Sequence, residues 1–275
     1  NHLQYSLLGD PALSLNFPTM KVVLDSINGI ACERTDTMPK LKAGSIARIA
    51  GHIEGKTDYQ GVVTATVRDS RALITCKLND TNEAEEAFQF SDLQKTLYQG
   101  SDSVSNGKFS FSFAVPKDIN YSDATGLLNL YSISNDKTMR AHGTSEKFTV
   151  GGSVGSRNDS IGPSIYCYLN SPSFVDGGDV NTTPFFVAKL SDRDGINAAG
   201  SGIGHDLQLV IDGDMTKTYN LNDHFTYDFG TYTSGSTYYS IHELSPGKHQ
   251  LTFIAWDIQN NRSATPHNIN VVSGW

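Results

Sequence analysis

The chain of 275 residues is poor in cysteine and has neither a long apolar run nor a cluster of basic residues. Its three cysteines, Cys32, Cys76 and Cys167, form no C-x-x-C pair, and an odd number cannot pair completely into disulfides. We therefore expect no metal–thiolate site, and we interpret Cys167, which shares a strand face with Ile165 and Leu169, as a small buried side chain rather than a nucleophile. No apolar run approaches the roughly 18 residues of a membrane-spanning helix, so the sequence predicts no such helix.

The charge balance excludes another class of function. The 29 Asp and Glu residues outnumber the 21 Lys and Arg residues, which gives a formal net charge of −8. A surface of this sign repels a phosphate backbone unless basic side chains gather in one patch, and no segment rich in Lys and Arg occurs. We therefore expect no nucleic-acid partner.

Motifs of common enzyme classes are also missing. The sequence contains no H-E-x-x-H helix and no G-x-x-x-x-G-K-[ST] loop. Its histidines form no ligand pair at short spacing, so we expect each to be hydrogen-bonded or on the surface: His142, His205, His224, His242, His249 and His267. We assign no catalytic, cofactor-binding or metal-ligating residue, and we expect no cofactor.

Alternation of apolar and polar residues is the dominant pattern, and it predicts β-strands. In the text KFSFSFAVP, Phe109, Phe111 and Phe113 point to one side and the serines between them to the other. The Asn106-Gly107 pair before this strand is typical of a type I′ turn and predicts a hairpin. Further strands in the first half are expected over 46–53, 61–69, 72–78, 126–133 and 146–152.

The text GGSVGSRNDSIGP has the composition of a linker, because its Gly, Ser, Asn and Asp residues leave almost nothing to bury. No helix of three turns is predicted, and NEAEEAF, residues 82–88, is expected to be a loop. We expect an all-β fold, with two tandem immunoglobulin-like β-sandwich domains over 20–152 and 163–275 and a linker over 153–162. Strands resume after the linker, over 164–169, 184–192, 205–213, 216–221, 236–244, 248–257 and 267–272.

Aspartate and glycine gather in SDRDGINAAGSGIGHDLQLVIDG, residues 191–213. Oxygen-rich loops suit Ca²⁺, yet the spacing of an EF-hand is missing because Gly195 follows Asp194 directly. Two interpretations stay open: a calcium site that includes Asp192, Asp194 and Asp206, or a glycine-rich turn in which Asp side chains accept backbone N–H groups. We expect the turn.

Aromatic residues gather in HFTYDFGTYTSGSTYYS, residues 224–240. They could stack on sugar rings or on a protein partner, but cross-strand pairs within a sheet are the commoner use. An adhesin or glycan-binding module is therefore the alternative function. It predicts glycan binding that is lost on Tyr238→Ala or Tyr239→Ala.

Several longer sequence segments resemble those of a known family. YSLLGDPALSLNFP, residues 5–18, closely resembles the segment that ends the catalytic domain of gingipain-like cysteine peptidases. Four further segments of the chain resemble the region downstream of the peptidase domain in type IX secretion system sortases of the PorU type. They are residues 103–121, 159–174, 194–213 and 238–263. Residues 1–19 are then the end of a peptidase domain. Because the chain opens at Asn1, without Met, we expect a processed product or a piece of a longer protein.

The resemblance implies a bacterial cell-surface endopeptidase that removes C-terminal signal domains from exported cargo and aids transfer of the cargo to anionic lipopolysaccharide. The family's catalytic His and Cys precede Asn1, and His2 and Cys32 do not match its motifs, so this chain is expected to be non-catalytic. Its expected role is that of a scaffold or interaction region at the cell surface or outer membrane. The expected partners are the upstream peptidase domain, cargo proteins and secretion-system components.

The linker suggests how such a region would act. Rigid β domains joined by about a dozen flexible residues hold a partner at an effective concentration that the linker length sets. This mechanism requires no chemistry from the chain itself.

Overall fold

The structure is a computed structural model that describes residues 20–34, 36–71, 73–75, 89–91, 94–155, 157–200 and 204–274. Within these residues it contains strands β1 to β21 and one 3-10 helix, η1 (Asn222–His224), so the fold is all-β as predicted. No helix in the described part is long and apolar enough to cross a membrane. The N-terminal segment 1–19 and the predicted loop 82–88 lie outside the described residues.

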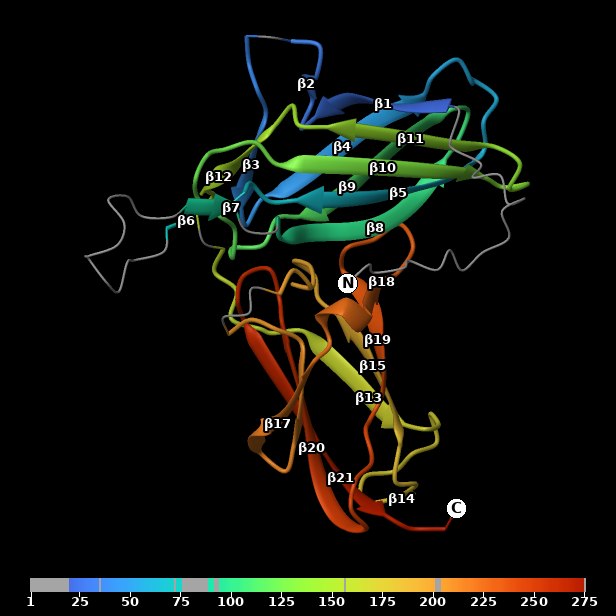
Figure 1. Cartoon of the computed structure of the whole chain (residues 1–275), viewed down its shortest axis with the longest axis vertical. Helices are drawn as coiled ribbons and strands as arrows, with labels where there is room; N and C mark the ends of the chain where they lie inside the picture. Colours follow the sequence, from blue (N-terminus) through green and yellow to red (C-terminus); the bar gives the residue numbers. More distant parts are fainter. Residues whose placement is uncertain are drawn as a thin grey trace, which may run out of the picture.

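The first group of sheets is built around one folded eight-stranded sheet. Strand β1 starts in parallel pairing with β11 and continues in antiparallel pairing with β4. Figure 1 shows β5, β8, β10 and β11 in front of β4 and β9, and the core lies between these layers. The order is β8 (Thr96–Val104), β5 (Gly61–Arg68), β10 (Leu127–Ser134), β11 (Arg140–Ser145), β1 (Met20–Ile27), β4 (Ile46–Ile53) and β9 (Lys108–Ala114), with β2 (Ile30–Ala31) beside β1.

Two small sheets complete this first group. Strand β3 (Lys40–Ala43) pairs in parallel with β12 (Thr149–Ser153). Strand β6 (Leu73–Thr75) pairs with β7 (Gln89–Ser91), and the rest of the predicted strand 72–78 lies outside the described residues.

The predicted turn is present, but the hairpin is not continued. Asn106 and Gly107 both have positive φ, 51° and 72°, as a type I′ turn requires. Beyond the bridge between Ser105 and Lys108, however, β8 and β9 separate to opposite ends of the sheet order. The alternation itself is correct, because the phenylalanines of β9 are buried in the first core.

The second group consists of two facing sheets that enclose a second core. One sheet has the order β13 (Ser164–Leu169), β15 (Phe185–Ser191), β19 (Ser234–Ser240) and β18 (Phe225–Tyr227). The other has the order β14 (Asp179–Val180), β21 (Arg262–Val271), β20 (Gly247–Trp256), β16 (Gln208–Ile211) and β17 (Asp214–Asn220). Leu169, Phe186 and Phe253 are among the largest side chains buried between them.

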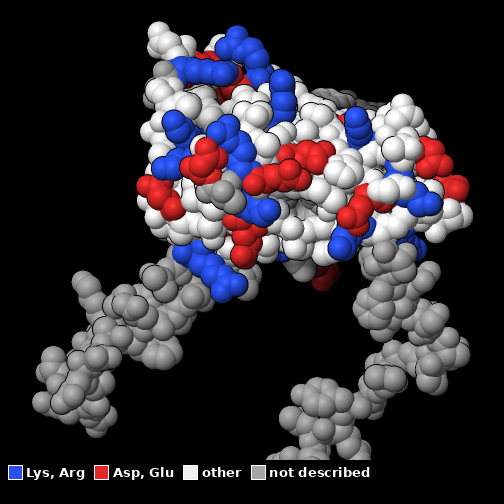
Figure 2. Space-filling model, turned by 90° about the horizontal axis from the view of Figure 1, so that it is seen from above, with Lys and Arg blue, Asp and Glu red and all other residues white. Residues whose placement is uncertain are grey.

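Surface charge is mixed on the end of the first group. Figure 2 shows Lys and Arg side chains beside Asp and Glu side chains on this face, rather than one continuous basic surface. The ion pair between Lys40 and Asp123, 2.9 Å, is of this kind. Such a face offers no broad basic patch.

Candidate functional site

The two cores meet at an aromatic contact between β8 and β18, which lie next to each other in Figure 1. Tyr227 packs against both cores, and its ring centroid lies 5.1 Å from that of Tyr98. The Gly230 amide donates to the Ser101 carbonyl at 2.9 Å. Gly195 also lies in this junction, because a Cβ there would lie 3.1 Å from the Ala114 side chain of the first group and 2.9 Å from the Tyr232 ring.

Polar side chains form a second contact across the same junction. The Asp118 carboxylate lies 2.7 Å from His205 Nδ1 and accepts a hydrogen bond of 3.3 Å from Asn197. Lys95 donates to the Asp118 carbonyl, and burial lowers the pKa of this lysine although nearby carboxylates oppose the shift. Because these groups come from both sides of the junction, they fix its orientation.

The connecting segment is bonded at both ends. The Val154 amide donates to the Ala43 carbonyl at 3.1 Å, and Arg157 donates to Asp194 at 2.9 Å. Further on, the side chain of Asn261 donates to the backbone carbonyl of Asp159 at 3.2 Å. The segment predicted as a linker is therefore hydrogen-bonded to both groups of sheets.

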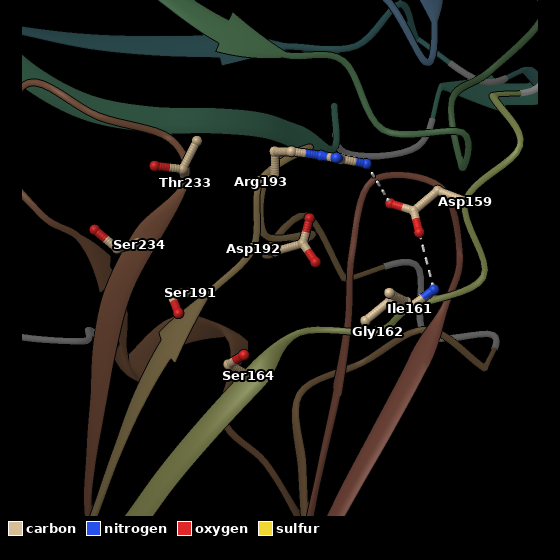
Figure 3. Close-up of a pocket in the computed structure, with 9 residues that line it drawn as sticks. All are labelled: Asp159, Ile161, Gly162, Ser164, Ser191, Asp192, Arg193, Thr233 and Ser234. Atoms are coloured by element: carbon tan, nitrogen blue, oxygen red, sulfur yellow. Dashed lines mark hydrogen bonds and ion pairs between the residues drawn. The ribbon is translucent and has the colours of Figure 1, made fainter.

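A groove of about 600 Å³ opens near the junction, where β13 and β19 begin and β15 ends (Figure 3). Ser191 lies directly opposite Ser164 on one side and Ser234 on the other, so the three hydroxyls form a row across the sheet. Asp159 accepts from the Ile161 amide at 3.0 Å and from Arg193 at 3.3 Å, and this ion pair forms one wall. The sequence did not predict the groove, because its parts come from three separate segments, 159–164, 191–193 and 233–234.

The groove lies over buried carboxylates. Burial raises the pKa of Asp192 to about 6, and the like charges of Asp257 and Asp194 add to the shift although backbone N–H groups oppose it. Asp257 is fully buried and accepts from the Asn261 amide at 2.7 Å. Asp194 is only 4% exposed, and one of its oxygens has no partner.

These distances decide which of the predicted acidic residues lie together. Asp192 and Asp194 are neighbours, and Asp192 accepts the Asp194 amide at 2.8 Å, as the glycine-rich-turn interpretation requires. Asp206 lies elsewhere, beside Gly200. Among the described residues, no three metal-binding side chains converge on one point.

The aromatic segment 224–240 divides between interior and surface. Tyr227 and Tyr232 pack against the first core, and Tyr239 packs 5.0 Å from Tyr219 between ring centroids. Tyr238 instead is 48% exposed on the outer face of β19. Most of these rings are thus structural, whereas Tyr238 lies on an exposed sheet face, as the binding interpretation of this segment requires.

That surface is the outer face of β13, β15 and β19. Tyr168 and Tyr238 lie on either side of Val187 in the register, and Phe185 lies two residues before Val187 on the same face. Phe185 is 42% exposed and Tyr166 is 51% exposed. We call these four aromatic residues the ring row: Tyr166, Tyr168, Phe185 and Tyr238.

A Ser–His–Asp arrangement occurs on the other sheet. His249 Nδ1 lies 2.7 Å from Asp212, and His249 Nε2 lies 3.4 Å from the Ser245 hydroxyl. The same Nε2 lies 2.7 Å from the Ser245 carbonyl, which can only accept. Both ring nitrogens therefore donate, and an imidazole that already carries both protons cannot activate the serine. This cluster holds the turn before β20.

Neither the described cysteines nor Ser153 offers a nucleophile. Ser153 is considered because GGSVG, residues 151–155, has the G-x-S-x-G spacing. Burial raises the pKa of the Cys167 thiol to about 12 and also raises the pKa of Cys32, so both thiols stay protonated. Cys167 is buried as predicted, and Cys76 lies outside the described residues. Ser153 in GGSVG ends β12, and no helix follows it, as a nucleophile elbow would require.

One comparison with known proteins is informative. The crystal structure of dimeric latent PorU from Porphyromonas gingivalis matches the whole of this chain with 33% sequence identity and a TM-score of 0.58. The chain spans 26% of the PorU chain, about a quarter of that protein. It is therefore related to a segment of PorU.

Other comparisons add nothing to the assignment. Spo0M, a sporulation control protein from Bacillus subtilis, matches 90% of the chain and 89% of its own length, but at 8% identity and a TM-score of 0.26. A TM-score this low does not establish a common fold. No protein-family model and no curated protein matches the chain.

Proposed function

We propose that this chain is the non-catalytic β-region of a gingipain-like cysteine peptidase that acts as a sortase in type IX secretion. The observation that carries the proposal is the match to PorU over the whole chain at 33% identity. The peptidase removes C-terminal signal domains of cargo and aids transfer of the cargo to anionic lipopolysaccharide at the cell surface. Its catalytic residues lie in the part of the protein that precedes this chain.

Within this proposal the two groups of sheets are immunoglobulin-like domains that act as one brace. The packing of Tyr98 against Tyr227 and the hydrogen bonds of Asp118 with His205 and Asn197 support a fixed angle between them. A brace of fixed angle presents its far end to cargo or to secretion components at a set distance from the peptidase domain. Orientation, rather than the effective concentration of a tethered domain, then governs the interaction.

Two observations test the proposal. The gene must encode a Cys/His peptidase domain directly upstream of the Asn1 codon, and its absence contradicts the assignment. In a strain that lacks the sortase, the full-length protein is then compared with a version without residues 160–275 at equal surface abundance. We expect the deletion to abolish removal of cargo signal domains, whereas normal processing would reduce the second group of sheets to a spacer.

The alternative function, a glycan-binding module or adhesin, is favoured by one observation. Three aromatic side chains of the ring row, Tyr166, Phe185 and Tyr238, are about half exposed on one sheet face. A brace without a binding role does not require exposed rings there.

A further inference from the structure

We propose that the outer face of β13, β15 and β19 binds a neutral glycan chain. The ring row stacks on the sugar rings, and the groove of Figure 3 holds their hydroxyl groups. This inference is independent of the sortase assignment; it rests on the alternative function, glycan binding, and names the class of ligand.

The ring row forms a continuous apolar surface. Val187 points outward with it, yet is only 2% exposed, because aromatic neighbours cover it from both adjoining strands. The rings of Phe185 and Tyr238 are nearly parallel, with 17° between their planes and 6.2 Å between centroids. Tyr166 and Tyr168 lie 5.7 Å apart, and the Tyr166 hydroxyl donates to the Pro172 carbonyl at 3.4 Å. The two pairs are thus held in place on either side of Val187.

Aromatic faces of this kind suit sugars. The face of an aromatic ring carries partial negative charge, and the C–H groups on one side of a pyranose ring carry partial positive charge. Tyrosine adds a hydroxyl at the edge, so an amphipathic ligand meets apolar and polar groups together. A rigid ring pair also loses little conformational entropy on binding.

The groove supplies hydrogen-bonding groups next to the rings. The hydroxyls of Ser164 and Ser191 make no side-chain hydrogen bond to any described residue, and they point into the groove in Figure 3. Arg193 is 83% exposed and uses only one of its N–H groups on Asp159. Hydroxyl groups of a sugar can both donate to and accept from such a set. Each hydrogen bond replaces one to water, so the set contributes mainly specificity.

The charges on this face favour a neutral ligand over an anionic one. The basic groups are Lys189, which lies between Tyr166 and Ser236 in the register, Arg193, and Arg157, which pairs with Asp194. They are matched by Asp159, Asp192 and Asp194, while Asp257 lies buried nearby. An anionic polysaccharide would meet at least as many carboxylates as cations, so it would gain no net attraction.

Affinity electrophoresis of the purified 275-residue chain tests the proposal. Native gels contain no polysaccharide, one of three neutral polysaccharides (mannan, xyloglucan or hydroxyethylcellulose) or the anionic polygalacturonate. We expect retardation in at least one neutral gel, and we expect Tyr238→Ala and Phe185→Ala each to weaken it about fivefold to tenfold. Met215→Ala is the matched control, because Met215 is 70% exposed but lies on β17 in the other sheet.

Circular dichroism shows whether each variant remains folded. If Tyr238→Ala fails to fold, Phe185→Ala tests the stacking, and Tyr238→Phe, which keeps the ring, should be retarded like the wild type. No retardation in any neutral gel overturns the proposal, as does retardation by polygalacturonate alone. Equal retardation of the wild type and both ring variants also overturns it. Sedimentation that shows a wild-type dimer and monomeric ring variants would assign the face to a second copy of the chain instead.

Discussion

Tyr98 of β8 and Tyr227 of β18 pack with their ring centroids 5.1 Å apart and 41° between their planes, although β8 belongs to the first core and β18 to the second. Tyr98 in turn stacks on Phe113, with 4.8 Å between ring centroids. The aromatic packing of the first core therefore continues without a break into the junction. The angle between the two groups of sheets is set by this packing and not by the connecting segment alone.

Truncation of Tyr227 should loosen the junction. The Tyr227 hydroxyl donates to the Ile196 carbonyl at 2.6 Å, and the ring packs against both cores. We expect Tyr227→Ala to lower the free energy of unfolding by about 2–4 kcal/mol and Tyr227→Phe to lower it by only about 1 kcal/mol, because phenylalanine keeps the ring. Urea denaturation measures both. Equal losses in the two variants would contradict a role for ring packing.

Gly107 should tolerate no side chain. It has φ of 72°, and a Cβ there would lie 2.0 Å from the Lys56 carbonyl oxygen. Gly29 has a similar φ of 77° but open space around it. We expect Gly29→Ala to cost about 1 kcal/mol from backbone strain, and Gly107→Ala to cost roughly 2–4 kcal/mol because the clash adds to that strain. Thermal or urea unfolding of both variants checks the difference, which should vanish if strain alone matters.

Asp192 should destabilise the fold at neutral pH. Its pKa is raised to about 6 by burial and by the neighbouring carboxylates, so folding favours the protonated form and the cost appears as the pH rises above its unfolded value of about 3.9. We expect Asp192→Asn to raise the free energy of unfolding at pH 8 by about 1–2 kcal/mol, allowing for solvent screening, because the amide oxygen can still accept the Asp194 N–H.

The gain from Asp192→Asn should disappear near pH 3.5, where the wild-type carboxyl is protonated in both states. Denaturation at the two pH values provides the measurement. A variant that is less stable than the wild type at pH 8 would rule out this account.

His249 should stabilise the fold below neutral pH. Burial would lower its pKa, but the hydrogen bonds with Asp212 and the Ser245 carbonyl outweigh that effect and raise the pKa. The contribution is therefore fully present below the unfolded pKa of about 6.5, and it is lost as the pH rises through the folded pKa. We expect His249→Gln to be more destabilising at pH 5.5 than at pH 9.

Asp212 sets the lower end of the pH range in which its pair with His249 stabilises the fold. Burial would raise its pKa, but the Gln250 amide and His249 lower it, so this carboxylate stabilises above about pH 3.9 and loses its effect as the pH falls through its folded pKa. In an Asp212→Asn background, the loss of unfolding free energy caused by His249→Gln should therefore depend much less on pH. Urea unfolding of the single and double variants reports this coupling, and additive effects would show that the two residues do not act as a pair.

Individual strands were predictable, because a strand with one buried face alternates in sequence. The predicted bounds 46–53 and 164–169 are those of β4 and β13. Strand β11 was not predicted, since its text RAHGTS buries only Ala141 and shows no apolar alternation. The pairing of β1 with both β4 and β11 also leaves no local pattern, because partners far apart in sequence decide it.

What the amino-acid sequence determines by itself is therefore local: the all-β character, the positive-φ turn at Asn106-Gly107 and the burial of Cys167. Side-chain alternation and backbone preference act between near neighbours, so they can be read from a short text. Tertiary structure alone decides that Tyr227 belongs to the junction, and that Tyr168 and Tyr238 lie on either side of Val187. These contacts join segments that meet only when the sheets form, and no local periodicity encodes such a meeting.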